Sequence, residues 1–231
     1  MGQQIQLKAS DGFSLGGYRA DAQGTTGGKP KGGLVIIQEI FGVNHHMRNL
    51  CDRFAALGYT ALAPAIFDRA KRDVDLGYDK AAMDEGVKLR AAIKLEDTLK
   101  DVQAAIDALQ APGQSAGKVG IVGYCWGGSL AFLGATRLSG LAGAVGYYGG
   151  MIAAHANEKP KVPTILHFGE KDQGIPMTDV EKVRAARPDV KIYVYPAGHG
   201  FSCDERAAFD KASHEKALDV TLAFLKQNLE N

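Results

Sequence analysis

The sequence predicts an α/β protein: one mostly parallel sheet, helices on both faces and an antiparallel edge at the N-terminus. Short apolar, β-rich runs alternate along the chain with helical patterns. Most of these runs are continuously apolar, as in strands that are covered on both faces. The length of 231 residues and the 45% hydrophobic content fit a single globular domain over residues 1–231.

The strands are predicted as follows. Residues 4–19, with a turn at Asp11-Gly12, form a hairpin at one edge of the sheet. Lys191 interrupts the apolar pattern of the last predicted strand, so this strand is placed near an edge. The six strands that follow the hairpin are 34–37, 59–62, 119–122, 141–145, 164–168 and 190–195.

Helical patterns fill the intervals between the strands. Gly58 gives the first helix a C-terminal stop. Thr178 and Glu181 have the spacing of a capping box at the start of the fourth pattern. The last pattern repeats leucines every three or four residues. The patterns are 46–57, 81–109 (one or two helices), 127–138, 178–186 and 206–229.

Composition excludes several classes of function. A formal net charge of +1 gives no electrostatic reason for binding nucleic acid or an anionic membrane. Three cysteines without a C-x-x-C pair argue against a disulfide framework or a zinc ribbon. There is no signal-peptide pattern and no apolar run long enough to span a membrane. We therefore expect a cytoplasmic protein, monomeric by default, that acts on a small molecule.

One motif carries the chemistry. Residues 123–127 (GYCWG) close a predicted strand and open a predicted helix. Gly-x-Cys-x-Gly in this context is the nucleophile-elbow pattern, with cysteine in place of serine. The two glycines permit a sharp turn that presents Cys125 at the carboxyl edge of the sheet and at a helix N-terminus, which favours a thiolate. Cys51 and Cys203 lack this context, and we interpret both as packing residues.

A thiol nucleophile needs a base and a group that orients the base. In folds with such an elbow, the acid and then the histidine follow the nucleophile along the chain. Asp172 follows the predicted strand 164–168, and His199 follows the strand 190–195. Both are therefore expected at the same sheet edge as Cys125, although a purely structural role for either residue stays open. The oxyanion would be bound by the N–H of Trp126 and an N–H within residues 38–42.

Five segments, in their order and spacing, resemble the dienelactone hydrolase (carboxymethylenebutenolidase) family of α/β-hydrolases. The resemblance extends from about residue 4 to residue 227. The segments are 38–42 (QEIFG), 123–128 (GYCWGG), 146–149 (GYYG), 169–172 (GEKD) and 199–201 (HGF).

The resemblance implies roles for individual residues. Cys125 resembles the family's nucleophile, Asp172 its acid and His199 its base. Glu39 resembles a carboxylate that holds the resting thiol and takes its proton when substrate enters, although a residue at a strand end can also be merely structural. The resemblance further implies oxyanion-hole amides at Ile40 and Trp126, and Tyr147 as a lining of the substrate pocket.

The sequence departs from the family where a substrate carboxylate would bind. Family members that hydrolyse dienelactone use arginines, one of them four residues beyond the histidine, and that position is Cys203 here. Arg206 is the nearest candidate for substrate binding, although it can also belong to the start of the last helix. The other arginine has no clear counterpart. Lys88 and Arg90 lie near its position, but both can also be ordinary solvent-facing residues. No metal site and no cofactor is implied.

The predicted reaction is hydrolysis of an activated ester or enol-lactone through a thioester on Cys125. A thiolate is a better leaving group than an ordinary alkoxide, so activated esters should be preferred. Two alternatives stay open: a general carboxylesterase acting on aryl or short-acyl esters, and a non-catalytic ligand receptor or thiol sensor on the same scaffold.

Overall fold

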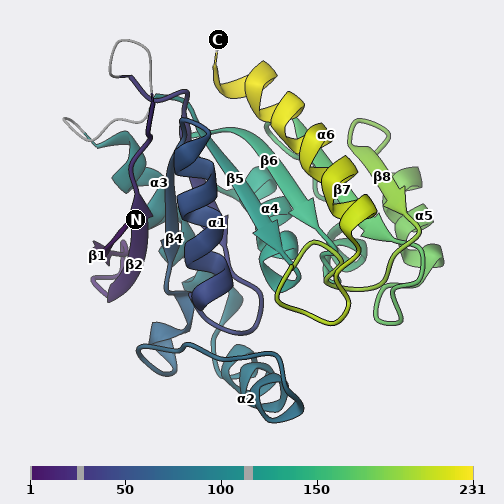
Figure 1. Cartoon of the computed structure of the whole chain (residues 1–231), viewed down its shortest axis with the longest axis horizontal. Helices are drawn as coiled ribbons and strands as arrows, with labels where there is room; N and C mark the ends of the chain where they lie inside the picture. Colours follow the sequence, from purple (N-terminus) through teal and green to yellow (C-terminus); the bar gives the residue numbers. More distant parts are fainter. Residues whose placement is uncertain (1, 25–28, 112–116, 231) are drawn as a thin grey trace.

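The computed structural model describes residues 2–24, 29–111 and 117–230, which form one eight-stranded sheet with helices on both faces (Figure 1). The strand order is β1-β2-β4-β3-β5-β6-β7-β8. β1, β2 and β4 pair antiparallel, and the pairs from β4 through β3 to β8 are all parallel. This is the α/β fold predicted from the sequence, with its antiparallel edge at the N-terminus.

The predicted strands are all present. The central strands β3 and β5 are completely buried, as their unbroken apolar sequences require. β8 forms the edge opposite β1, and Lys191 on it is exposed. The strands are β1 (Gln3–Lys8), β2 (Ser14–Ala20), β3 (Gly33–Ile37), β4 (Thr60–Pro64), β5 (Val119–Tyr124), β6 (Leu141–Tyr147), β7 (Thr164–Gly169) and β8 (Lys191–Tyr195).

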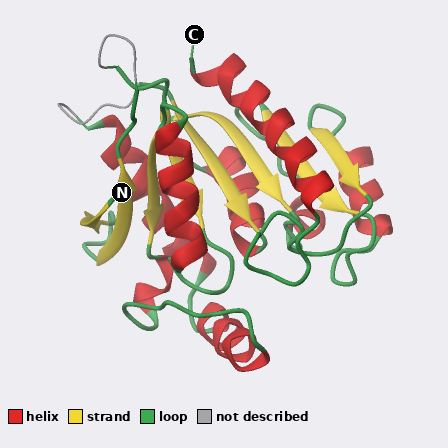
Figure 2. Ribbon diagram, in the orientation of Figure 1, coloured by secondary structure: helices red, strands yellow, loops and turns green. Residues whose placement is uncertain are grey.

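Helices α1 and α6 lie on the near face of the sheet in Figure 2, and α3 and α4 lie behind it. Each face therefore has its own apolar core. Helix α2 lies beyond the carboxyl ends of the strands, at the edge of the sheet where the loops that follow the parallel strands are located. The helices are α1 (His45–Ala56), α2 (Lys80–Ala91), α3 (Leu95–Gln110), α4 (Trp126–Arg137), α5 (Met177–Ala186) and α6 (Lys211–Leu229), with 3-10 turns η2 (Ile66–Arg69) and η3 (Ile152–His155).

Most predicted helix starts are displaced by one residue, but two features at helix starts differ from the prediction in kind. The capping box at Thr178 does not form, because α5 already begins at Met177, after Pro176. The last helix does not begin at Arg206, because residues 200–209 form successive turns and the side chain of Asp210 caps α6. The predicted stop of the first helix is confirmed by Gly58, which has a φ of 96°. The pattern over 81–109 divides into two helices, α2 and α3.

Candidate active site

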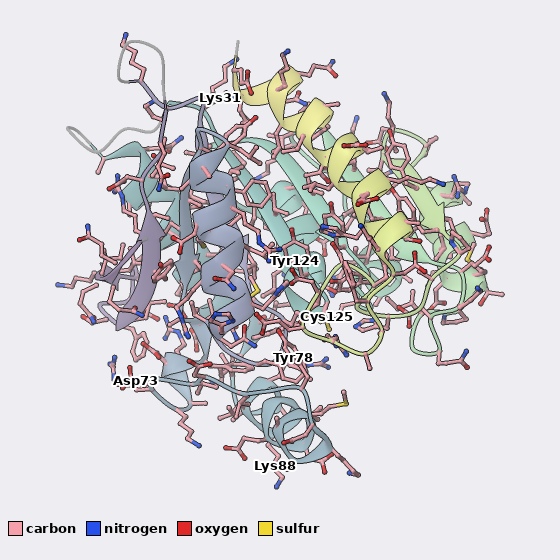
Figure 3. All side chains as sticks on the ribbon, in the orientation of Figure 1. Lys31, Asp73, Tyr78, Lys88, Tyr124 and Cys125 are labelled. Carbon is pink, nitrogen blue, oxygen red and sulfur yellow. The ribbon has the colours of Figure 1, made fainter. Side chains whose placement is uncertain are left out.

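Cys125 lies at the carboxyl edge of the sheet, where β5 ends and α4 begins (Figure 3). Its backbone has φ 55° and ψ −117°, a strained conformation for a residue with a side chain. The turn closes because Gly123 and Gly127 have no Cβ. An added Cβ on Gly123 would overlap the backbone of Gly127, and one on Gly127 would overlap the carbonyl of Ile37. The strained turn predicted for this motif is therefore present.

The structure brings Asp172 and His199 together from the loops after β7 and β8. Nδ1 of His199 lies 2.7 Å from Oδ2 of Asp172. The other carboxylate oxygen accepts the N–H groups of Gly174 at 2.8 Å and Ile175 at 3.1 Å, which fixes the buried Asp172 side chain. Because the carboxylate only accepts hydrogen bonds, Nδ1 of His199 carries a proton and Nε2 is left to act as the base.

The side chain of Cys125 is a second hydrogen-bond partner of the His199 ring. Burial would lower the pKa of His199, but the hydrogen bonds with Asp172 and Cys125 together raise it to about 10. The ring is thus a strong proton acceptor beside the sulfur. This arrangement can draw a proton from Cys125 and hold the resulting imidazolium against Asp172.

Glu39 lies directly after β3, and its partner is Arg206. Oε1 of Glu39 and Nη1 of Arg206 are 2.9 Å apart; the Glu39 side chain is buried, and the Arg206 side chain is 13% exposed. Oε2 of Glu39 is also buried, and none of the described residues donates a hydrogen bond to it. The carboxylate therefore pairs with an arginine, not with the resting thiol that the resemblance implies. The thiol contacts His199 instead.

Arg206 lies close enough to Cys125 to interact with it electrostatically, although it stands seven residues beyond His199. Its guanidinium lies 5.5 Å from the ring centroid of Phe41 and 5.7 Å from that of Tyr78. Burial would lower the pKa of Arg206, but the nearby charges, that of Glu39 foremost, together outweigh burial, and the pKa is raised above its usual value. The residue is thus a permanently charged group, held by two rings and one carboxylate.

The two expected oxyanion-hole segments lie side by side. Trp126 opens α4, so its N–H is among those that have no acceptor within the helix. The carbonyls of Ile37 and Gln38 pack directly on Gly127, which brings the segment leading to Ile40 against the elbow. Helix α2 fixes this segment from outside, since Gly86 packs on the carbonyl of Ile40.

The neighbouring tyrosines Tyr147 and Tyr148 face different surroundings. The hydroxyl of Tyr147 lies 2.6 Å from Oγ1 of Thr221 on α6, and its ring stacks on Tyr124 in the core. The ring of Tyr148 lies 5.1 Å from that of His199, and its buried hydroxyl has no hydrogen-bond partner among the residues in the described ranges. The tyrosine beside the histidine is therefore Tyr148, one residue after the one singled out by the resemblance.

Tyr78 is a residue of this site that sequence reasoning missed. It lies between Cys125 and helix α2 in Figure 3, and its ring meets Phe41 edge-on with a centroid separation of 4.7 Å. Its hydroxyl accepts a hydrogen bond from Asn44 at 3.1 Å and contacts Cys203. No motif marks a single tyrosine in a loop. Lys88, by contrast, is exposed and points away from Cys125.

Within residues 2–24, 29–111 and 117–230, no group of three or more His, Cys, Asp or Glu side chains is arranged to hold a metal ion. None of the helices in these ranges combines the length and the apolar character needed to cross a membrane.

Comparison with known proteins places this chain in a family. The model of the dienelactone hydrolase family matches residues 17–229. A putative carboxymethylenebutenolidase of Synechocystis sp. is 36% identical over 193 residues, which cover 77% of this chain and 78% of that protein. The carboxymethylenebutenolidase of Pseudomonas putida is 32% identical over 228 residues, which cover 96% and 94% of the two chains.

Solved structures agree with this result. The crystal structure of a putative dienelactone hydrolase from Klebsiella pneumoniae superimposes with a TM-score of 0.85 at 27% identity, covering 98% of this chain and 99% of that one. The Pyrococcus furiosus esterase Pf2001 shares the fold, with a TM-score of 0.72 at 15% identity over 99% of this chain and 93% of that one. The chain belongs to the dienelactone hydrolase family of α/β-hydrolases.

Proposed function

We propose that this protein hydrolyses an activated ester or an enol-lactone, with Cys125 as the nucleophile and a thioester acyl-enzyme as the intermediate. The observation that carries the proposal is the contact of Cys125, on its strained turn, with a histidine that Asp172 holds at 2.7 Å. A strained nucleophile, an adjacent base and a fixed orienting carboxylate are the three parts that acyl transfer requires.

In the first half of the reaction, the sulfur of Cys125 attacks the carbonyl carbon as a thiolate, its proton being held by His199. The carbonyl oxygen becomes an oxyanion, which accepts hydrogen bonds from the N–H groups of Ile40 and Trp126. The C–O bond to the leaving group then breaks, and the proton on His199 neutralises the departing oxygen. A stabilised enolate departs more readily than an ordinary alkoxide, which is the reason for the preference for activated esters.

In the second half, His199 takes a proton from a water molecule, whose oxygen attacks the thioester. The tetrahedral species collapses, the C–S bond breaks, and the carboxylic acid leaves. The thiolate of Cys125 is thereby restored beside the protonated His199. Asp172 keeps the ring oriented throughout and stabilises its charged form.

We further propose that Arg206 binds a carboxylate of the substrate. It is a permanent cation in the site, and it is balanced only by Glu39 among the described residues that pair with it. A substrate carboxylate would share or displace this partner by a bidentate interaction. Glu39, once released, would become a second proton acceptor close to the reacting groups. Tyr148 would line the apolar wall beside His199.

Steady-state hydrolysis of dienelactone and of a 4-nitrophenyl acyl ester tests the proposal. We expect wild type to hydrolyse both, Cys125→Ala to hydrolyse neither, and Arg206→Gln to lose dienelactone turnover selectively. Turnover of the aryl ester alone would indicate a general carboxylesterase. Binding without Cys125-dependent turnover would indicate a receptor or a thiol sensor.

A further inference from the structure

The segment that carries Arg206 is also attached to the outside of the active site. Residues 200–209, here called the anchor loop, follow His199 and form successive turns. The N–H of Arg206 donates to the carbonyl of Cys203 at 3.1 Å, and that of Phe209 donates to the carbonyl of Arg206 at 3.0 Å. Asp204 lies within the first of these turns, only two residues before Arg206. The two side chains extend to different partners: Arg206 to Glu39, and Asp204 to helix α1.

Asp204 contacts two side chains of α1. Its Oδ2 accepts a hydrogen bond from Nη2 of Arg53 at 2.6 Å, and its Oδ1 lies 3.2 Å from Nδ1 of His46. His46 is only 1% exposed, and burial lowers its pKa, so the ring is neutral. Burial would raise the pKa of Asp204, but Arg53 lowers it, so the carboxylate is ionised. His46 must therefore donate its Nδ1 proton to Asp204.

The adjacent residue makes a pair of a different kind. Oε1 of Glu205 lies 2.6 Å from Nδ1 of His45, but the His45 side chain is 69% exposed. Solvent-exposed pairs contribute little to holding a structure. Asp204, with a buried histidine and a charge-assisted bond to Arg53, is thus the stronger attachment of the anchor loop to α1.

We propose that Asp204 is a positioning residue for carboxylate recognition: by attaching the anchor loop to α1, it holds Arg206 in the orientation that receives a substrate carboxylate. This inference rests on the proposed role of Arg206. An arginine side chain has many rotamers, and fixing its backbone before binding removes part of the ordering cost. Misplacement by about 1 Å can cost roughly 10²-fold in rate.

Alkylation of Cys125 tests this without a known substrate. Iodoacetate carries a carboxylate and iodoacetamide does not, and both react with the same sulfur. The ratio of their rate constants, divided by the ratio for a free thiol such as 2-mercaptoethanol, measures attraction of a carboxylate to the site. Peptide mass spectrometry restricts the measurement to Cys125. The iodoacetamide rate reports whether each variant has kept its fold and its thiol reactivity.

We expect the normalised ratio to exceed one in wild type and to fall to about one in Arg206→Gln. Asp204→Asn should lower it about tenfold at most, which a displacement below 1 Å would produce. Asp204→Glu should restore part of the ratio, and Glu205→Gln, the matched change at the exposed neighbour, should leave it as in wild type. The iodoacetamide rate should be unchanged in Asp204→Asn.

Two outcomes would overturn the inference, and a third would overturn its premise. If Arg206→Gln abolishes the preference and Asp204→Asn retains it, Asp204 does not position Arg206. If Asp204→Asn slows both reagents equally, its role is general folding. If Arg206→Gln keeps the wild-type ratio, Arg206 does not attract carboxylates, and the proposed function fails in that part.

Discussion

Glu39 and Arg206 are 167 residues apart in the sequence, yet their side chains form a largely buried ion pair with an N–O distance of 2.9 Å. Glu39 stands at the end of the central strand β3, and Arg206 stands in the loop before α6. The pair therefore joins the first half of the sheet to the C-terminal segment, directly beside the candidate nucleophile.

Removing both members of this pair should cost less than the sum of the two single removals. Glu39→Gln leaves a buried guanidinium without its countercharge, which typically costs about 3–5 kcal/mol. The double variant Glu39→Gln/Arg206→Gln has no charge left to compensate, so its loss should be smaller than the sum of the two single losses. Urea unfolding of the four proteins gives the coupling energy. Additive losses would show that the two residues do not stabilise one another. The exposed pair of Lys80 and Asp84 provides a control in which neutralisation should have no measurable effect.

Gly127 and Gly134 lie in the same helix but should respond in opposite ways to alanine. A Cβ at Gly127 would overlap the carbonyls of Ile37 and Gln38, so Gly127→Ala should displace the elbow and abolish turnover. A Cβ at Gly134 would meet nothing closer than Cδ1 of Ile121 at 3.4 Å. Gly134→Ala should therefore be neutral or stabilise by up to about 1 kcal/mol, because alanine favours helix. Thermal unfolding and esterase assays of both variants check this, and equal effects would contradict the packing described.

Asp172→Asn should change both rate and pH dependence. The pKa of His199 is about 10 in the folded protein, against about 6.5 in an unfolded chain. The folded state thus keeps a proton that the unfolded chain releases, so this stabilisation is complete below pH 6.5 and is lost as the pH rises towards 10. Without the Asp172 charge, the free energy of unfolding should decrease less steeply between these pH values. In the same variant, kcat/KM should fall by roughly 10⁴-fold. Urea unfolding at pH 6.5, 8 and 9.5 measures the slope, and a slope equal to that of wild type would show that Asp172 does not stabilise the imidazolium.

His167 should make the protein sensitive to acid. The ring is buried between the hydroxyls of Tyr195 at 2.8 Å and Thr221 at 3.2 Å, and burial lowers its pKa to about 3. Between pH 6.5 and 3 the unfolded chain binds a proton that the folded chain excludes. The free energy of unfolding therefore decreases as the pH is lowered through this window. The slope from one such group reaches about 1.4 kcal/mol per pH unit.

Replacing His167 by glutamine should therefore destabilise the protein at pH 7, by about 1–3 kcal/mol from lost hydrogen bonds, and flatten the acid slope. The matched control is His45→Gln at an exposed site, which should leave the slope as in wild type. The measurement is urea unfolding at pH 7 and pH 5. An unchanged slope in His167→Gln would mean that other groups cause the acid sensitivity.

The fold could be predicted from the sequence because strands buried on both faces have continuously apolar sequences. β3 and β5 show this directly. The elbow was also predictable, since its glycines are required by backbone contacts that span only a few residues. The start of α6 was not, because residues 206–210 contain ordinary helix formers and only tertiary contacts of the anchor loop hold them in turns.

Part of the site could not be read from the sequence. The proximity of Asp172 and His199 could be predicted because each lies in the loop after a strand of the parallel sheet, where loops meet at one edge. Arg206 was ambiguous, since its pairing with Glu39 depends on how the anchor loop folds across the sheet. That the ring of Tyr148 lies beside His199 was likewise not predictable: Tyr148 has a φ of 39°, and no local pattern predicts which way the rings of Tyr147 and Tyr148 turn.

The central claim is that Cys125 becomes acylated, and rapid-quench mass spectrometry tests it directly. Wild type mixed with a 4-nitrophenyl ester and quenched in acid should carry one acyl group, which peptide mapping should place on Cys125. The adduct should disappear in Cys125→Ala, together with turnover, and should persist longer in His199→Ala, where no base activates the water. An acyl group on another side chain, or undiminished hydrolysis by Cys125→Ala, would contradict the account.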